Sequence, residues 1–293
     1  MRSALFLRRE NRFAVRVRLV SSAFAGGGLK QGDAPGNKGL CGVEITGEDA
    51  EVLCHLPNSG RLCELLTPGA RCLVWSPPER CEAGARLARK TAYRLGFVEI
   101  PGGRGWASVD ATLPNALIAD CLQRLPERFY SLLGLAYPPS DSPRFWQQEV
   151  RFGRSRIDFL LNTAGELPGV ENCSEARTAV CAGKAPAAVL LEVKSVTLVA
   201  DGVALFPDAP TARGHRHLEL LLQAMHQQSL GAAILFVVQR EDATCFAPNR
   251  QSDPIFAGLL RQAAAAGLKV VALACKVRPP TVDLQLDPLP VRL

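Results

Sequence analysis

Two short segments decide the fold: Gly153-Arg154-Ser155-Arg156-Ile157-Asp158-Phe159-Leu160-Leu161 and Val189-Leu190-Leu191-Glu192-Val193-Lys194. Each has the length and apolar character of a buried strand, yet each carries an acidic side chain. Burying an ionised group costs several kcal/mol unless something compensates. A divalent cation shared by Asp158 and Glu192 would compensate. Lys194 follows Glu192 by two residues, so both side chains point to the same face of a strand.

These groups suit metal-assisted hydrolysis of a phosphodiester. Carboxylates hold Mg²⁺ or Mn²⁺, which neutralises the phosphate and lowers the pKa of bound water. A nearby lysine orients that water or stabilises developing charge. We therefore assign Asp158 and Glu192 as metal ligands and Lys194 as a catalytic group, with Glu149 on the preceding strand as a third candidate acid. The alternative is a Glu–Lys surface pair at a strand end, with Asp158 as its neighbour.

The composition indicates a folded protein of about two domains. The chain has 293 residues, and 47% of them are hydrophobic, which is enough for sizeable cores. It has no apolar run of about 18 residues, so we expect no membrane span. The apolar patch near the N-terminus is too short for a signal peptide. The ten cysteines lack zinc-site spacing, and we expect a cytoplasmic protein.

The positive charge is confined to the first third of the chain. Residues 1–95 hold 15 Lys and Arg against 9 Asp and Glu, whereas residues 96–293 hold 19 of each. A basic module joined to a neutral one suggests that the first holds an anionic polymer on which the second acts. The alternative is a bias that only favours solubility.

Residues 1–98 are expected to form a small β-barrel of the oligonucleotide/oligosaccharide-binding (OB) type, because several short strands are separated by Gly- and Pro-rich turns. In the first strand, 13–20, Val15 and Val17 alternate with Arg16 and Arg18, which places guanidinium groups on the outer face. The other strands are expected at 50–56, 70–75 and 91–98.

Arginines at exposed positions are the candidate contacts to a nucleic acid backbone, because guanidinium groups bind phosphate. Some precede or lie on the first strand, one follows it in a barrel loop, two flank the turn before Asp158, and one begins a helix. The predicted set is Arg9, Arg12, Arg16, Arg18, Arg61, Arg154, Arg156 and Arg213. For each of them an ordinary solvated loop or strand position is the alternative.

The rest of the chain is expected to form a helical connector, 99–145, and a mixed-sheet domain, 146–293. The connector contains a helical apolar stripe over 114–125. The order strand, strand, strand, helix, strand, helix, strand then predicts a mixed sheet flanked by helices. These elements are expected at 148–152, 156–161, 187–193, 213–230, 232–238, 254–266 and 269–274, with a loop at 162–186.

A second polar cluster begins the helix at 213–230. Thr211 is a potential N-cap, and cationic side chains including Arg213 then crowd the positive end of the helix, which suits phosphate binding. Asp208 and His217 belong to this cluster, and Gln239 closes a buried strand expected near the site. A polar helix start with no ligand is an equal alternative.

Several motifs resemble those of the sugar fermentation stimulation proteins of bacteria and archaea. They run in the same order from about residue 9 to residue 240: Arg9-Glu-Asn-Arg-Phe13, His55-Leu-Pro-Asn-Ser-Gly-Arg61, Leu113-Pro-Asn115, Ser155-Arg-Ile-Asp-Phe-Leu160, Glu192-Val-Lys-Ser-Val-Thr-Leu198, Phe206-Pro-Asp-Ala-Pro-Thr-Ala-Arg-Gly214 and Phe236-Val-Val-Gln-Arg240. The chain departs from the family pattern in two loops, 25–42 and 162–186.

The resemblance implies an α/β (α+β) fold class: an N-terminal OB-like barrel followed by a restriction-endonuclease-like, PD-(D/E)xK domain. It also implies nucleic acid binding, with DNA favoured over RNA. Asp158, Glu192 and Lys194 match the D…ExK pattern. The superfamily includes members that bind without cutting. A metal-dependent nuclease is therefore the first hypothesis, a non-catalytic DNA-binding regulator linked to sugar metabolism the second, and a carbohydrate-linked enzyme the last.

Overall fold

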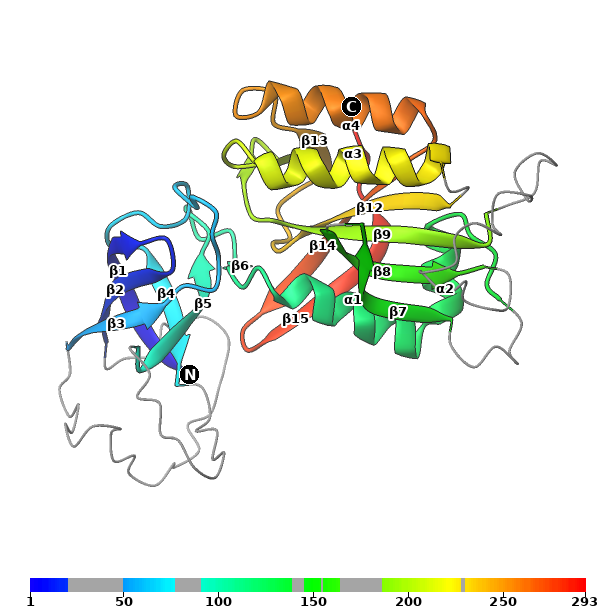
Figure 1. Cartoon of the computed structure of the whole chain (residues 1–293). Coiled ribbons are helices and arrows are strands. Elements are labelled where there is room, and N and C mark those ends of the chain that lie inside the picture. Colours follow the sequence, from blue (N-terminus) through cyan, green and yellow to red (C-terminus); the bar gives the residue numbers. More distant parts are fainter. Residues whose placement is uncertain (21–49, 77–90, 139–144, 154, 164–185, 228–229) are drawn as a thin grey trace, which may run out of the picture. The chain divides into compact units, whose positions relative to one another are not determined.

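The computed structural model describes residues 1–20, 50–76, 91–138, 145–153, 155–163, 186–227 and 230–293 (Figure 1). The loop predicted at 25–42, most of that at 162–186, and Arg154 lie outside these ranges. The chain divides into two compact units, residues 1–111 with 277–281 and residues 112–276 with 282–293. Of the expected connector, residues 99–111 thus group with the first unit and residues 112–145 with the second.

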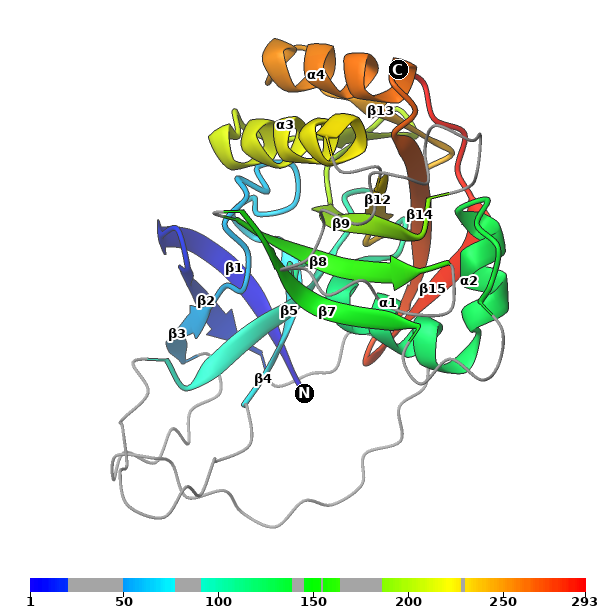
Figure 2. The same ribbon diagram turned by 45° about the vertical axis from the view of Figure 1, so that its right-hand side comes forward.

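The first unit is a closed barrel, as predicted. Its strands are β1 (Arg2–Asn11), β2 (Ala14–Leu19), β3 (Glu51–His55), β4 (Arg71–Trp75), β5 (Tyr93–Glu99) and β6 (Trp106–Ser108) (Figure 2). Their order is β3-β2-β1-β4-β5-β6, and an additional parallel pairing of β3 with β5 closes the sheet on itself. Closure removes the exposed edges that an open sheet of this size would present.

The alternating pattern of β2 forms as expected, but the strand before it was missed. Val15 and Val17 are fully buried while Arg16 and Arg18 point outward. The prediction that Arg9 precedes the first strand is wrong, because Arg9 lies within β1. Ala4 and Phe6 are buried and the residues between and after them are less so, which is the alternation of a strand. Because all four residues of Ala4–Leu7 are apolar, this alternation is not visible in the sequence.

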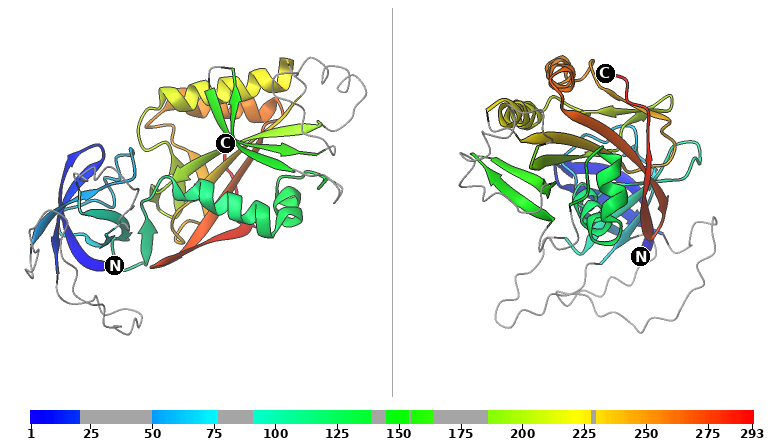
Figure 3. Two further views of the ribbon diagram at one scale, coloured as in Figure 1. Left: turned by 60° about the horizontal axis from the view of Figure 1, so that its bottom comes forward. Right: turned by 90° about the vertical axis from the view of Figure 1, so that its right-hand side faces the viewer.

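The second unit contains a mixed sheet, as predicted, but it has six strands where the sequence indicated five. The sheet order is β15-β14-β12-β9-β8-β7 (Figure 3). Strand β12 is parallel to both β9 and β14, whereas β8 is antiparallel to β9 and to β7. These strands are β7 (Trp146–Phe152), β8 (Ser155–Asn162), β9 (Ala188–Val196), β12 (Gly231–Val238), β14 (Lys269–Arg278) and β15 (Thr281–Pro288).

Helices lie on both sides of this sheet. Helices α3 (Ala212–Gln227) and α4 (Pro254–Ala265) lie together on one side, and α1 (Leu113–Arg124) and α2 (Pro126–Leu132) lie on the other (Figure 1). Apolar residues of α3 and α4 share one core cluster with alternate residues of β9 and β12. A strand covered on both faces is apolar along its length, and this accounts for the run Ala188–Leu191.

Several strands were not predicted from the sequence. Strands β10 (Val199–Ala200), β11 (Val203–Phe206) and β13 (Cys245–Pro248) form a small separate sheet, and β15 extends the main sheet beyond β14. These strands are either very short or, like β15, only half-buried, so their hydrophobic periodicity is weak. Within the described residues, no helix combines the length and apolarity that crossing a bilayer requires.

Candidate metal and catalytic site

The register of β8 and β9 places the two predicted acids at the same level of the sheet. The paired residues end at Phe159↔Leu191, and one further step of this register sets Asp158 opposite Glu192. Residues opposite one another in an antiparallel pair project to the same side. At this point the backbone N–H of Val193 donates to Asp158 Oδ2 at 2.8 Å. The Asp158 side chain of β8 thus accepts a hydrogen bond from the backbone of the adjoining strand β9.

Glu192 is buried in the centre of the sheet, and its two oxygens have different surroundings. Oε1 accepts hydrogen bonds from Lys194 Nζ at 2.5 Å and from His217 Nδ1. Oε2 is buried and has no hydrogen-bond partner among the described residues. Burial acts to raise the pKa of Glu192, but the His217 hydrogen bond and the Lys194 charge outweigh it, so its pKa lies below the ordinary value. The carboxylate is therefore ionised, and among the described residues only one of its two oxygens has hydrogen-bond partners.

Asp158 is held by a neutral partner as well as by the backbone. Asn115 of α1 donates from Nδ2 to Asp158 Oδ1 at 2.7 Å. Burial raises the pKa of Asp158, and the nearby charge of Glu192 raises it further. A cation between the two carboxylates would relieve both effects, because it favours the charged form of each.

His217 reaches the site from α3, and its position depends on how that helix begins. Thr211 caps the helix as the sequence indicates, since Gly214 N–H donates to Thr211 Oγ1 at 3.0 Å. One turn further on, His217 Nδ1 bonds Glu192, and Nε2 accepts from Arg213 Nε at 3.4 Å. An acceptor at Nε2 requires the proton on Nδ1, so His217 donates to the carboxylate.

The donor set fits a hard divalent cation rather than zinc. Nowhere in the described part of the chain do three or more His, Cys, Asp or Glu side chains gather as a metal cluster. Mg²⁺ commonly uses one or two carboxylates and keeps several waters, whereas structural zinc needs four protein ligands. The unpartnered Oε2 of the Glu192 carboxylate is one oxygen ligand of the kind that Mg²⁺ prefers, and Asp158 lies beside it.

Other predicted site residues of this unit have different surroundings. Glu149 is opposite Asp158 in the β7–β8 register, but its positive φ of 51° interrupts the ladder. Its carboxylate pairs with exposed Arg156 at 3.2 Å. Asp208 is partly buried in the turn between β11 and α3. Gln239 is fully buried and donates to the Oγ of Ser195 at 2.8 Å. Ser195 is the residue that follows Lys194.

The predicted arginines of the barrel have three kinds of surroundings. Arg16 pairs with Glu10 at 2.7 Å, and Arg18 pairs with Glu51 at 3.2 Å. Arg9 donates to several backbone carbonyls, those of Asn11, Arg12, Asn58, Gly60 and Arg61. Arg12 and Arg61 are exposed. The geometry therefore gives Arg9 a structural role and leaves two turn arginines at the surface.

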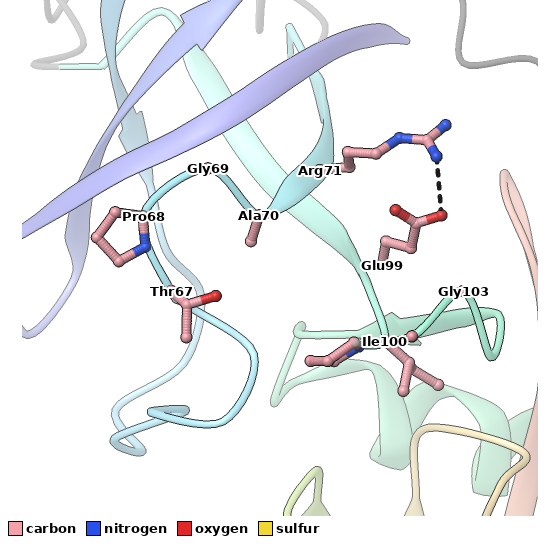
Figure 4. Close-up of a pocket in the computed structure, with 10 residues that line it drawn as sticks. Thr67, Pro68, Gly69, Ala70, Arg71, Glu99, Ile100 and Gly103 are labelled. Carbon is pink, nitrogen blue, oxygen red and sulfur yellow. Dashed lines mark hydrogen bonds and ion pairs between the residues drawn. The ribbon is translucent and has the colours of Figure 1, made fainter.

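The barrel also contains a shallow hollow of about 320 Å³ that the sequence did not indicate (Figure 4). The segments 67–71 and 99–103 line it, and the ion pair of Arg71 with Glu99, 3.0 Å long, closes one side. Several of its lining residues are glycine or proline. Nothing in its chemistry resembles the acid pair of the second unit.

Sequence reasoning missed Asn115 and the partnership of His217 with Glu192. Asn115 stands in a Leu-Pro-Asn motif, but no spacing rule connects it with a strand 43 residues later. His217 was predicted as part of a phosphate-binding cluster at the start of this helix, with a polar helix start as the alternative, and not as a partner of Glu192. Its contact depends on how α3 packs on β9, which local sequence patterns do not specify.

Comparisons with known proteins decide the family. The model described as the SfsA N-terminal OB domain matches residues 7–109, and that described as the sugar fermentation stimulation protein RE domain matches residues 113–281. The chain belongs to the sugar fermentation stimulation protein family. A homologue from Moorella thermoacetica is 41% identical over 205 residues, which cover 70% of this chain and 74% of the homologue. One from Natranaerobius thermophilus is 37% identical, with 83% and 85% covered.

A solved structure of the same family supports the fold. It is the structure of Pyrococcus furiosus SfsA in complex with Ca²⁺. The match has a TM-score of 0.65 at 24% identity and covers 100% of this chain and 96% of the other. The predicted fold class, an OB barrel followed by a mixed-sheet domain, is confirmed for this family member.

Proposed function

We propose that this family member is a divalent-metal-dependent nuclease that hydrolyses phosphodiester bonds of nucleic acid bound by its OB domain. One observation carries the proposal: Glu192 is buried and ionised, with Oε1 held by Lys194 and His217 and Oε2 left without a partner beside Asp158. A buried charge with an unsatisfied oxygen is costly. A bound cation would stabilise that oxygen.

Each residue has a distinct task in this proposal. Asp158 and Glu192 would hold Mg²⁺ or Mn²⁺, which would supply charge neutralisation of the phosphate and a more acidic water. Asn115 and the Val193 N–H fix the orientation of Asp158. His217 fixes Glu192, and the Lys194 ammonium lies within hydrogen-bond distance of that carboxylate, where it would stabilise charge that develops on the phosphate.

The OB domain suggests nucleic acid as the substrate. Barrels of this type bind oligonucleotides and oligosaccharides, and the excess positive charge of the chain lies in this region. The relative from Pyrococcus furiosus was solved in complex with Ca²⁺, a cation that, like Mg²⁺, takes oxygen ligands. We propose DNA rather than RNA as the substrate, as the family resemblance implies.

The test is cleavage of labelled single- and double-stranded DNA and RNA by the purified full chain with Mg²⁺, Mn²⁺ or no metal. Metal-dependent cleavage by the wild type, abolished in Asp158→Asn and Glu192→Gln, is the expected result. Both substitutions keep the size of the side chain and remove its charge. Asp120→Asn serves as a control, because Asp120 forms an exposed ion pair with Arg124 on α1. Cleavage undiminished in the first two variants would refute the assignment.

One observation favours the second hypothesis, a non-catalytic DNA-binding regulator. Lys194 is bonded to Glu192, and both oxygens of Asp158 already accept hydrogen bonds. Three of the four carboxylate oxygens are thus satisfied within the protein. A regulator predicts salt-sensitive binding of DNA, no turnover with either metal, and unchanged affinity in Lys194→Ala.

A further inference from the structure

The turn between β1 and β2 presents an aromatic ring to solvent on the OB barrel. Phe13 is 48% exposed and is the one aromatic side chain among the large apolar residues exposed in the described ranges. The neighbouring core residues of the barrel, including Val15, are buried although the Phe13 ring does not cover them. In OB folds the loop between the first two strands borders the oligonucleotide-binding face. The ring is thus exposed where a ligand of this fold is bound.

The backbone of this turn is held rigidly. Phe13 N–H donates to Asn11 Oδ1 at 2.9 Å, and Phe13 C=O accepts from Leu56 N–H at 2.8 Å. The carbonyl of Arg12 accepts from Arg9 Nη2 at 2.7 Å. An exposed ring on a fixed backbone loses little conformational freedom when a ligand binds to it.

Arg9 links Arg61, which lies in another loop, to the turn that carries Arg12 and Phe13. The Arg9 guanidinium bonds the carbonyl of Arg12 and, through Nη1, the carbonyl of Arg61 at 2.8 Å. Arg12 and Arg61 are 49 positions apart in sequence and both are exposed. The Arg12 guanidinium carbon also lies 5.6 Å from the centroid of the Phe13 ring. The hydrogen bonds of Arg9 therefore hold together the backbone of two exposed arginines, one of which lies next to an exposed aromatic ring.

We propose that Phe13 is a stacking platform for an unpaired base, and that Arg12 and Arg61 bind the adjacent phosphates of a single-stranded nucleic acid. Aromatic rings beside basic side chains are how proteins hold single strands, because every base has a flat apolar face. A duplex keeps its base faces covered by stacking.

The inference rests on the nucleic acid binding of the proposed function but not on catalysis. It is tested with the full chain in EDTA, by fluorescence anisotropy with a labelled 20-nucleotide oligo(dT) and with a mixed-sequence duplex of equal length. Phe13→Ala should weaken single-strand binding about tenfold, the effect expected for one stacked base. The duplex affinity and the slope of log affinity against log salt concentration should both stay within twofold of the wild-type values.

Three further variants separate the contributions. Phe13→Trp should keep the single-strand affinity, and oligo(dT) should quench its added fluorescence. Arg12→Ala should lower the slope of log affinity against log salt by about 0.7, the value for one phosphate on a single strand. Ile255→Ala removes an exposed apolar side chain of the second unit, 62% exposed, and should change nothing.

The outcomes keep the two proposals apart. If Phe13→Ala binds oligo(dT) as wild type does, or loses duplex affinity equally, the stacking site is refuted whether or not the protein cleaves. A wild type that binds no single strand also refutes it. Loss of oligo(dT) binding in Phe13→Ala, in a protein that cleaves nothing with any metal, supports the stacking site and refutes the nuclease.

Discussion

Substitution of His217 by alanine tests whether this side chain positions Glu192 for metal binding. His217 is 4% exposed, and its Nδ1–H bonds Glu192 Oε1, the oxygen that Lys194 also holds. Without it Glu192 keeps Lys194 as a single donor and gains rotational freedom, so Oε2 no longer has a fixed direction. Loss of such an outer partner of a metal ligand weakens metal affinity by about 10- to 100-fold.

The assay is titration of the full chain with Mn²⁺ by isothermal calorimetry, with free Mn²⁺ followed by electron paramagnetic resonance. His217→Gln restores an N–H donor and should recover much of the affinity. His215→Ala is the matched control, because His215 lies on the same helix but bonds Asp253 at 2.8 Å. It should reduce stability and leave Mn²⁺ affinity within twofold.

Unfolding by urea completes this test. His217→Ala should cost about 1–3 kcal/mol, as expected for a buried charged group that loses a hydrogen bond. If Mn²⁺ binds His217→Ala as tightly as wild type, or if His215→Ala and His217→Ala weaken binding equally, the positioning role is refuted. A metal affinity that falls only in His217→Ala supports it.

Three more predictions follow from named contacts. Lys194→Ala should lower the cleavage rate by about 100-fold or more in single-turnover assays while DNA affinity changes less than twofold, and a rate within threefold of wild type would contradict the proposed charge stabilisation. Asp253→Ala should cost about 1–2 kcal/mol in urea unfolding, because Asp253 caps α4 through Phe256 N–H and also accepts from Thr211 N–H. Burial acts to raise the pKa of Asp253, but these N–H groups outweigh it and lower the pKa below 3.8. The stabilisation by Asp253 should therefore be complete above pH 3.8 and be lost only as the pH falls through the lowered pKa. A loss of stability between pH 7 and pH 5 that is absent in Asp253→Ala would contradict this. Arg9→Lys should lower stability and speed amide exchange at Phe13 and Leu56, since a lysine cannot span the carbonyls that Arg9 bonds, whereas Arg16→Lys, in a surface ion pair, should change stability by less than about 0.5 kcal/mol.

Local periodicity predicted the long helices and the central buried strand well, although it missed β1 and β15. The helix expected at 114–125 is α1, and the buried strand expected at 187–193 is β9, extended to Val196 so that Lys194 lies within it. The helix expected at 213–230 is α3, with Thr211 as its cap. Such elements are long enough for one apolar face to repeat several times. Short strands such as β10 and β13 contain too few residues for that repeat.

The arginines show the limit of reasoning from residue type. Arg9, Arg16 and Arg12 all belong to a basic segment and look alike in sequence, but the fold gives them different partners. Arg9 bonds carbonyls of a distant loop, Arg16 pairs with Glu10, and Arg12 lies exposed beside Phe13. A count of positive charges cannot distinguish these three, because their partners depend on which loops meet across the barrel.

The sequence by itself determined which side chains are chemically unusual: an acid in each of two apolar strands and a lysine two residues after the second. Chain-local physics suffices for this, because strand periodicity fixes the faces of Glu192 and Lys194. Only the tertiary structure decided that Asn115 orients Asp158, that His217 holds one oxygen of Glu192, and that the other oxygen is unpartnered among the described residues. Those contacts join segments far apart in sequence, and the packing of α1 and α3 on the central strands sets them.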